Sequence, residues 1–214
     1  MDLYLSLLLL SGLAFAFSIA AFAWRLRSFS MLNRPPDQAP ARGRVGSGIV
    51  YAYTLGMAPW SKESTRRHWV SYMRGVAFHM GIFLGLAILL TSPWLGGLPA
   101  LWSSLLGVGA GIGAIFGLMG YVARYFERNL KSLSTPDDYA SVLLVSVFLA
   151  SASLWLFYPP AFPVFYLSAA VMLVYAPFSK IRHCIYFAYS RLFYGKVIGS
   201  RAILPHNQQK VERI

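Results

Sequence analysis

Five long apolar segments constrain this 214-residue chain more than any other feature. They cover about residues 3–24, 75–94, 101–123, 139–158 and 163–189. Each is close to the roughly 20 residues that a helix needs to cross about 30 Å of hydrocarbon. Only 12% of the residues are charged, against about a quarter in soluble domains. The sequence therefore predicts an all-α integral membrane protein, a five-transmembrane-helix bundle that forms a single membrane domain.

All 19 basic residues lie on one predicted side of the membrane. Nine fall in a loop at about residues 25–74, three follow the third span, and seven lie between residues 180 and 213. The opposite side carries only Asp2 as a charged side chain. By the positive-inside rule, the N-terminus lies outside and the tail, about residues 190–214, is cytoplasmic. This placement accounts for the net charge of +12 without nucleic acid, and it predicts a multi-pass protein of the cell inner (cytoplasmic) membrane.

The first span could be mistaken for a cleaved signal peptide, because Ala21 and Ala23 form a possible cleavage motif. No basic residue precedes the span, however, and Arg25 and Arg27 follow it directly. We interpret it as an N-out anchor that is retained. In the loop that follows, residues 33–48 are expected to be irregular and residues 61–72 helical.

Two histidines lie within predicted spans, where an ionisable side chain is costly and indicates a function. At 1.5 Å per residue, His79 lies about 6 Å into the second helix and His183 about 9 Å from the inner end of the fifth. These helices run in opposite directions, so both imidazoles are expected at a similar depth below the cytoplasmic face. Such a pair can provide both axial ligands of a b-type haem. Alternatively, each histidine hydrogen-bonds a neighbouring helix or extends to the interface.

The remaining histidines and the single cysteine give weaker signals. His68 lies about 16 Å closer to the cytoplasm than His79 on a helical rise, and we interpret it as an interfacial or partner-facing residue. His206 belongs to the polar tail and is expected to be solvated. Cys184 is the only cysteine in the sequence, which excludes an intrachain disulfide, a cysteine-ligated iron–sulfur cluster and a CxxCH haem attachment site.

Four basic residues near the predicted inner boundary are candidates to contact haem propionates or a quinone headgroup. They are Arg74, Arg124, Lys180 and Arg182. Lys180 stands out because it lies three residues before His183, on nearly the same helical face. The alternative is that these long side chains extend to lipid phosphates.

Glycines in two spans predict close helix packing. Gly109, Gly113 and Gly117 form a small-residue face in the third span, of the kind that lets membrane helices approach closely. Gly81 and Gly85 have the same spacing in the second span, where we also expect them to make room for the porphyrin. A proline at position 177 is expected to kink the fifth span.

Around both histidines, the sequence resembles the respiratory nitrate reductase gamma subunit and its relatives. These relatives include the membrane cytochrome b subunits of heterodisulfide-reductase-like and dissimilatory-sulfite-reductase-associated complexes. The motifs that carry the resemblance are FHMGI at 78–82, STPDDY at 134–139 and PFSKIRH at 177–183. The number of spans and the N-out topology are also similar.

This resemblance implies a haem b whose iron is bound by His79 and His183. The nitrate reductase pattern has a second pair of ligands nearer the outer face. Where those ligands would fall, this chain has Leu89 and Phe165, and neither side chain can bind iron. We therefore expect one haem.

Together, these features predict a membrane cytochrome b subunit of a respiratory quinone oxidoreductase complex. It would pass electrons through one haem b between membrane quinone and a cytoplasmic iron–sulfur or other redox partner subunit. It would be an electron-transfer subunit and not a complete enzyme alone, so no catalytic residue is predicted. The alternative function is a haem-free membrane anchor or a small proton or solute transport subunit. Acidic residues in the span cores would favour transport, and the predicted cores contain none.

Overall fold

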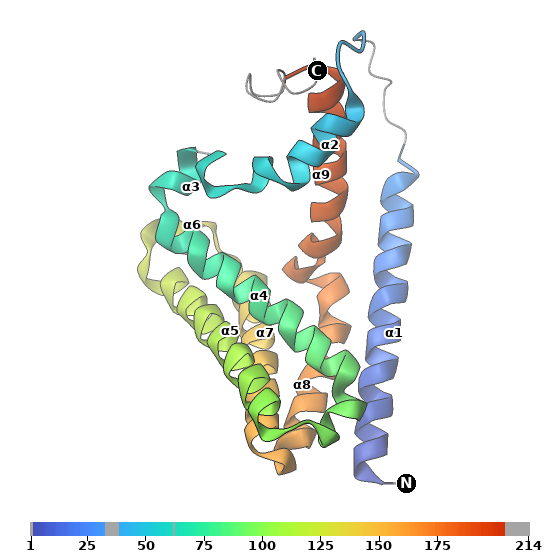
Figure 1. Cartoon of the computed structure of the whole chain (residues 1–214), viewed down its shortest axis with the longest axis vertical. Coiled ribbons are helices and arrows are strands. Elements are labelled where there is room, and N and C mark those ends of the chain that lie inside the picture. The colour runs from blue at the N-terminus through green and yellow to red at the C-terminus, as the bar shows by residue number, and fades with distance from the viewer. Residues whose placement is uncertain (1, 33–38, 62, 204–214) are drawn as a thin grey trace. The chain divides into compact units, whose positions relative to one another are not determined.

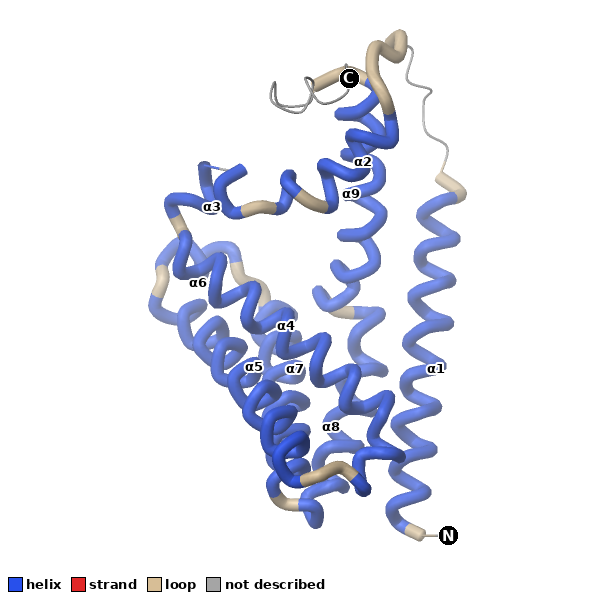
Figure 2. The backbone as a smooth tube through the Cα atoms, viewed as in Figure 1, coloured by secondary structure: helices blue, strands red, loops and turns tan. Residues whose placement is uncertain are grey.

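The computed structural model describes residues 2–32, 39–61 and 63–203. All regular secondary structure in these residues is helical, and they contain no strand (Figure 1, Figure 2). Five helical stretches are long and apolar enough to cross a membrane: Leu3–Ser30, Trp69–Gly97, Ala100–Phe126, Pro136–Phe157 and Pro159–Phe178. The predicted all-α, multi-pass membrane fold with five spanning helices is confirmed.

The α-helices in chain order are α1 (Leu3–Ser30), α2 (Val45–Tyr53), α3 (Glu63–Arg67), α4 (Trp69–Thr91), α5 (Ala100–Phe126), α6 (Arg128–Leu133), α7 (Pro136–Phe157), α8 (Phe162–Tyr175) and α9 (His183–Ser200). Short 3₁₀ helices join them: η1 (Leu55–Met57), η2 (Pro59–Ser61), η3 (Ser92–Gly97), η4 (Pro159–Ala161), η5 (Ala176–Phe178) and η6 (Lys180–Arg182).

The chain forms two compact units, and each is described by itself. Unit 1 comprises Met1–Ala23 and Val70–Arg182, which include most of α1 and helices α5, α7 and α8. Unit 2 comprises Trp24–Trp69 and His183–Ile214, which include α2 and α9. The expected single membrane domain is therefore organised as two units.

Glycine contacts hold α4 against α5 in unit 1. A Cβ atom added to Gly81 would lie 2.6 Å from the Cα of Gly113, so the two backbones touch, as expected for small residues at a membrane-helix interface. A Cβ atom at Gly85 would lie 2.6 Å from a methyl carbon of Leu149 in α7. Gly81 and Gly85 therefore make room for α5 and α7, and the expectation that they make room for a porphyrin is wrong.

An aromatic stack fills the centre of unit 1. The ring of Phe165 in α8 lies 4.8 Å from that of Trp155 at an interplanar angle of 8°, and 5.9 Å from that of Phe148 at 19°. Phe148, Phe165 and the neighbouring Tyr166 are fully buried. Offset stacking of this kind adds to the stability gained by burying large rings.

The fifth apolar segment is not the continuous helix that we expected over residues 163–189. Helix α8 ends at Tyr175, η5 and η6 follow, and α9 begins at His183 (Figure 2). Pro177 lacks a backbone N–H, so it cannot continue the hydrogen-bond ladder of α8. Ser179 then has an extended backbone, with φ −104° and ψ −176°. The result is a break in the helix in place of the expected kink, and it ends the apolar span at Phe178.

Unit 2 is built on a contact between α2 and α9. A Cβ atom at Gly48 would overlap the backbone of Gly195 and Gly199, and the Tyr53 hydroxyl donates to the carbonyl oxygen of Ala188 at 2.5 Å. Helix α2 lies in the loop predicted over residues 25–74, so this loop is more ordered than its composition suggests. Helix α9 likewise occupies much of the predicted tail.

Candidate functional site

His79 makes a hydrogen bond within its own helix. Its Nδ1 lies 2.7 Å from the carbonyl oxygen of Gly75, one turn earlier in α4. A carbonyl oxygen only accepts, so Nδ1 is the donor in this hydrogen bond. Histidines that bind metals are commonly fixed by this kind of hydrogen bond from the second ring nitrogen.

The face of α4 that carries His79 is open. Gly75 lies four residues before His79 and therefore on the same face. Beyond the adjacent backbone of its own helix, a Cβ atom added to Gly75 would meet no described atom within 4 Å. The His79 side chain is exposed, as are Met80 and Phe83 beside it. The described part of unit 1 therefore does not cover this face of α4 at Gly75.

His183 is the first residue of α9, directly after the helix break. It is exposed and belongs to unit 2, whereas His79 belongs to unit 1. We therefore describe each histidine within its own unit. The next residue is Cys184, and desolvation raises the pKa of its thiol above the ordinary value.

Two of the predicted cationic residues are held by polar groups of unit 1. The Arg74 guanidinium lies 3.7 Å from the Glu127 carboxylate. Arg124 donates to the Ser134 hydroxyl at 3.1 Å, while its Nε is buried without a hydrogen-bond partner in the described residues. A buried donor of this kind is costly unless a ligand or water satisfies it, so Arg124 can bind an additional oxygen acceptor.

The other two predicted cations lie in η6. The Lys180 ammonium is 3.3 Å from the Asp138 carboxylate, and the backbone N–H of Arg182 donates to the carbonyl oxygen of Ser179 at 3.2 Å. Lys180 therefore has a structural partner that the sequence analysis did not foresee.

Two acidic residues in the STPDDY motif are the polar groups that sequence reasoning missed. The Asp137 carboxylate accepts the backbone N–H of Lys180 at 2.8 Å and the hydroxyl hydrogen of Tyr175. Asp138 accepts the backbone N–H of Thr135 at 2.8 Å in a capping box at the start of α7. A signal for them is present in the sequence. The chain has only seven acidic residues, and two of them are adjacent at the start of a predicted span.

The positions of a possible outer haem are occupied by core side chains. Leu89 is 7% exposed and Phe165 is fully buried. Phe165 belongs to the aromatic stack described above, so its ring fills the space in which an outer ligand would stand.

The remaining histidines do not extend this site. His68 lies in a turn between α3 and α4, so it does not share the helix of His79. His206 lies outside the described residues. Within the described part of the chain, no group of three or more His, Cys, Asp or Glu residues could hold a metal ion, but a haem requires only two axial ligands.

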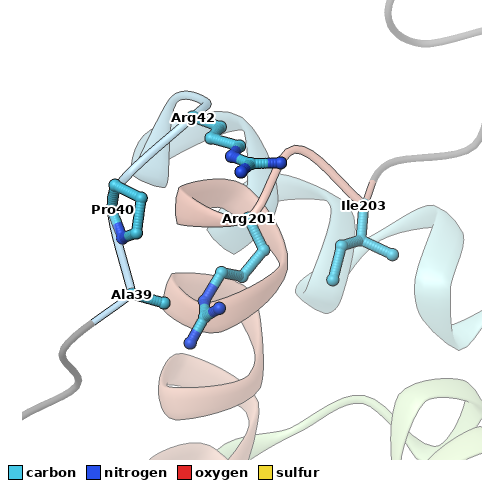
Figure 3. Close-up of a pocket in the computed structure, with 5 residues that line it drawn as sticks. All are labelled: Ala39, Pro40, Arg42, Arg201 and Ile203. Atoms are coloured by element: carbon cyan, nitrogen blue, oxygen red, sulfur yellow. The ribbon is translucent and has the colours of Figure 1, made fainter.

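One pocket of about 290 Å³ lies in unit 2. Figure 3 shows its lining residues: Ala39, Pro40, Arg42, Arg201 and Ile203. The side chains of Arg42 and Arg201 point in different directions (Figure 3), so they do not form a paired anion site.

Comparison of the chain with protein-family models, curated protein sequences and solved structures gives no significant match. The resemblance to the nitrate reductase gamma family therefore rests on the three short motifs and the order of the spans.

Proposed function

We propose that the protein is a membrane cytochrome b subunit of a respiratory quinone oxidoreductase complex. In this proposal, His79 and His183 bind the iron of one haem b. The subunit connects membrane quinone with a cytoplasmic iron–sulfur or other redox subunit, and it is not a complete enzyme alone.

The observation that carries the proposal is the hydrogen bond between His79 and Gly75. A neutral imidazole that donates from Nδ1 has its lone pair on Nε2, the atom that would bind iron in this proposal. This hydrogen bond also occurs within an apolar spanning helix, on a face that is open at Gly75.

The packing of unit 1 favours one haem over two. Leu89 and Phe165 stand where outer ligands would be required, and both are buried among other side chains. A second porphyrin would have to displace the stack of Phe165, Trp155 and Phe148.

A b-type haem, when bound, would supply a one-electron iron couple. The residues of the chain would bind and orient it. The imidazoles of His79 and His183 would provide the axial nitrogens, and Arg124 would offer its buried Nε–H to a propionate or a quinone oxygen. Arg74, Lys180 and Arg182 are weaker candidates, since Arg74 and Lys180 already pair with carboxylates.

Charge supports docking of an acidic partner on the predicted cytoplasmic side. The described part of unit 2 carries exposed arginines at Arg66 and Arg67 and one acidic side chain, Glu63, which pairs with Arg67 at 2.5 Å. A cytoplasmic redox subunit with an acidic surface would be attracted to such a region.

The alternative of proton or solute transport has less support. The described acidic residues near the spans lie at helix ends: Asp2, Glu127, Asp137 and Asp138. The Asp2 carboxylate accepts the backbone N–H of Tyr4, and the other three each interact with a basic or hydroxyl group. None of the described acidic residues lies at the middle of a spanning helix, where a proton relay would be expected.

A single measurement tests the proposal. The full-length protein should be purified from membranes, and its pyridine haemochrome should be compared with its protein concentration. We expect a reduced b-type spectrum with one haem per chain. A folded protein without haem would contradict the proposal, and two haems per chain would contradict the assignment of a single site.

A further inference from the structure

The link between the spanning helices α5 and α7 exposes two large apolar side chains. Phe126, the last residue of α5, is 82% exposed, and Leu133, the last residue of α6, is 79% exposed. No other large hydrophobic side chain of the described residues is as exposed as these two. Side chains of this size gain free energy when a membrane or a partner covers them.

Helix α6 separates its charged residues from its apolar residues. At about 100° per residue, Arg128 and Lys131 lie on one face of this helix, and Leu130 and Leu133 lie on the opposite face. Arg128 and Lys131 are both exposed, whereas Leu130 is partly buried. Helix α6 is therefore amphipathic, which is the pattern of a segment that lies along a membrane surface.

Hydrogen bonds within unit 1 hold this link in place. The Arg124 guanidinium of α5 donates to the Ser134 hydroxyl at 3.1 Å, and Ser134 donates to the carbonyl oxygen of Leu130 at 2.7 Å. The Tyr139 hydroxyl of α7 donates to the carbonyl oxygen of Arg124 at 3.0 Å. All three hydrogen bonds are partly buried, so α6 is fixed against the ends of α5 and α7.

The acidic residues near the link have partners, and the two cations of α6 do not. Three acidic side chains each contact a basic or hydroxyl group of unit 1: Glu127, Asp137 and Asp138. Arg128 and Lys131, in contrast, form no ion pair with any residue that the structure describes. Their positive charge is available to an anion outside the chain.

The path of the chain keeps these groups at the membrane surface. One apolar span ends at Phe126 and the next begins at Pro136, so residues 127–135 lie beside the lipid headgroups on one side of the bilayer. Phospholipid phosphates are present at this level, and an anionic headgroup adds a net negative charge that attracts basic residues. A soluble acidic partner would have to displace lipids that are already there.

We propose that the link between α5 and α7 binds anionic phospholipid of the surrounding bilayer. Phe126 and Leu133 enter the boundary between headgroups and acyl chains, and Arg128 and Lys131 bind the phosphate and the anionic headgroup. The ligand is a phospholipid with a net negative charge, such as phosphatidylglycerol. This site lies in unit 1 and does not depend on haem or on the proposed electron transfer.

A fluorescent label in the link tests the proposal in the full-length protein. Ser132 is exposed and lies next to Lys131, so Ser132→Cys in a Cys184→Ser background can carry bimane. The labelled protein is reconstituted into phosphatidylcholine bilayers that contain increasing amounts of a quencher lipid. This quencher is phosphatidylglycerol or phosphatidylcholine with a nitroxide near the top of the acyl chain.

We expect phosphatidylglycerol to quench the bimane at a lower mole fraction than phosphatidylcholine does. An attraction of about 1 kcal/mol per basic residue at an anionic membrane corresponds to a difference of about fivefold for each charge. Added salt should reduce this difference, because it screens exposed charges.

Variants at the same positions separate charge from apolar contact. Arg128→Gln combined with Lys131→Gln should remove most of the preference for phosphatidylglycerol. Arg128→Lys combined with Lys131→Arg is the matched control, and it should keep the preference because both charges remain. Leu133→Gln should weaken quenching by both lipids and leave the preference between them in place.

Three outcomes would contradict the proposal. Equal quenching by the two lipids would exclude selective binding of anionic lipid, and a preference that survives loss of both cations would exclude Arg128 and Lys131 as its source. Absence of quenching by either lipid would show that the link faces water or a partner protein. None of these readouts uses haem, so the result is independent of whether the proposed function holds.

Discussion

The Nδ1 atom of His79 donates to the carbonyl oxygen of Gly75, one helical turn earlier, over 2.7 Å. This bond engages one of the two ring nitrogens of His79 within its own helix. Under the proposed function, the other nitrogen, Nε2, would bind the iron.

The first prediction concerns the two ligands. His79→Ala and His183→Ala should each abolish haem binding, because the proposed haem would be held by both imidazoles. Reduced-minus-oxidised spectra of membranes that contain equal amounts of each variant would measure the effect.

His68→Ala is the matched control for that experiment. Because His68 lies in the turn before α4, the spectrum of the His68→Ala variant should equal that of the wild type. A normal spectrum in His183→Ala would remove this residue as a ligand, and loss of haem in His68→Ala alone would mean that the wrong histidine had been chosen.

The second prediction concerns the open position beside His79. Gly75→Leu should lower haem occupancy without loss of folded protein, because no described atom lies within 4 Å of a Cβ at this position and the added side chain would occupy the space for the porphyrin. Gly12→Leu is the control, because Gly12 in α1 is equally open. Equal haem content in the two variants would show that the porphyrin does not lie against Gly75.

The third prediction concerns the contact between α4 and α5. Gly81→Ala should destabilise the protein by about 1–3 kcal/mol, the usual cost of forcing extra atoms into a packed interior, because the new methyl group would lie 2.6 Å from the Cα of Gly113. Gly75→Ala should instead be neutral or stabilise α4 by up to about 1 kcal/mol, the difference in helix propensity. Thermal unfolding in detergent, followed by circular dichroism, would compare them.

The fourth prediction is the topology. In a Cys184→Ser background, Ser47→Cys in α2 and Gly96→Cys in η3 should be labelled from opposite sides of the membrane, Ser47→Cys from the cytoplasm. An impermeant maleimide applied to intact cells and to inverted vesicles would show this. Labelling of both sites from one side would overturn the orientation that the positive charges predict.

Hydropathy and charge predicted the spanning helices well but not the end of the fifth. The expected helix over residues 163–189 includes Pro177, and an apolar run continues after it, so local sequence favours a kinked helix. At this break, Asp137 accepts the backbone N–H of Lys180, which lies 43 residues later in the chain. A long-range hydrogen bond of this kind leaves no periodic signal in the sequence.

The candidate site was predicted in part for a similar reason. His79 could be chosen from its type and place, because an imidazole in an apolar helix is rare and costly. The sequence did not indicate which glycine lies beside it. Sequence alone does not distinguish a glycine that packs against another helix from one that does not. The structure does so here: α5 and α7 cover Gly81 and Gly85 but not Gly75.

The contact of Gly48 with Gly195 and Gly199 has a consequence for the order in which the protein is made. Helix α2 leaves the ribosome early, whereas α9 is translated only after α4, α5, α7 and α8. Throughout that interval, the glycine face of α2 has no partner from α9. Unit 2 therefore closes only after the intervening helices have been synthesised. A chain whose translation stops before α9 leaves the glycine face of α2 without its partner, a feature by which quality control would distinguish it from the finished protein.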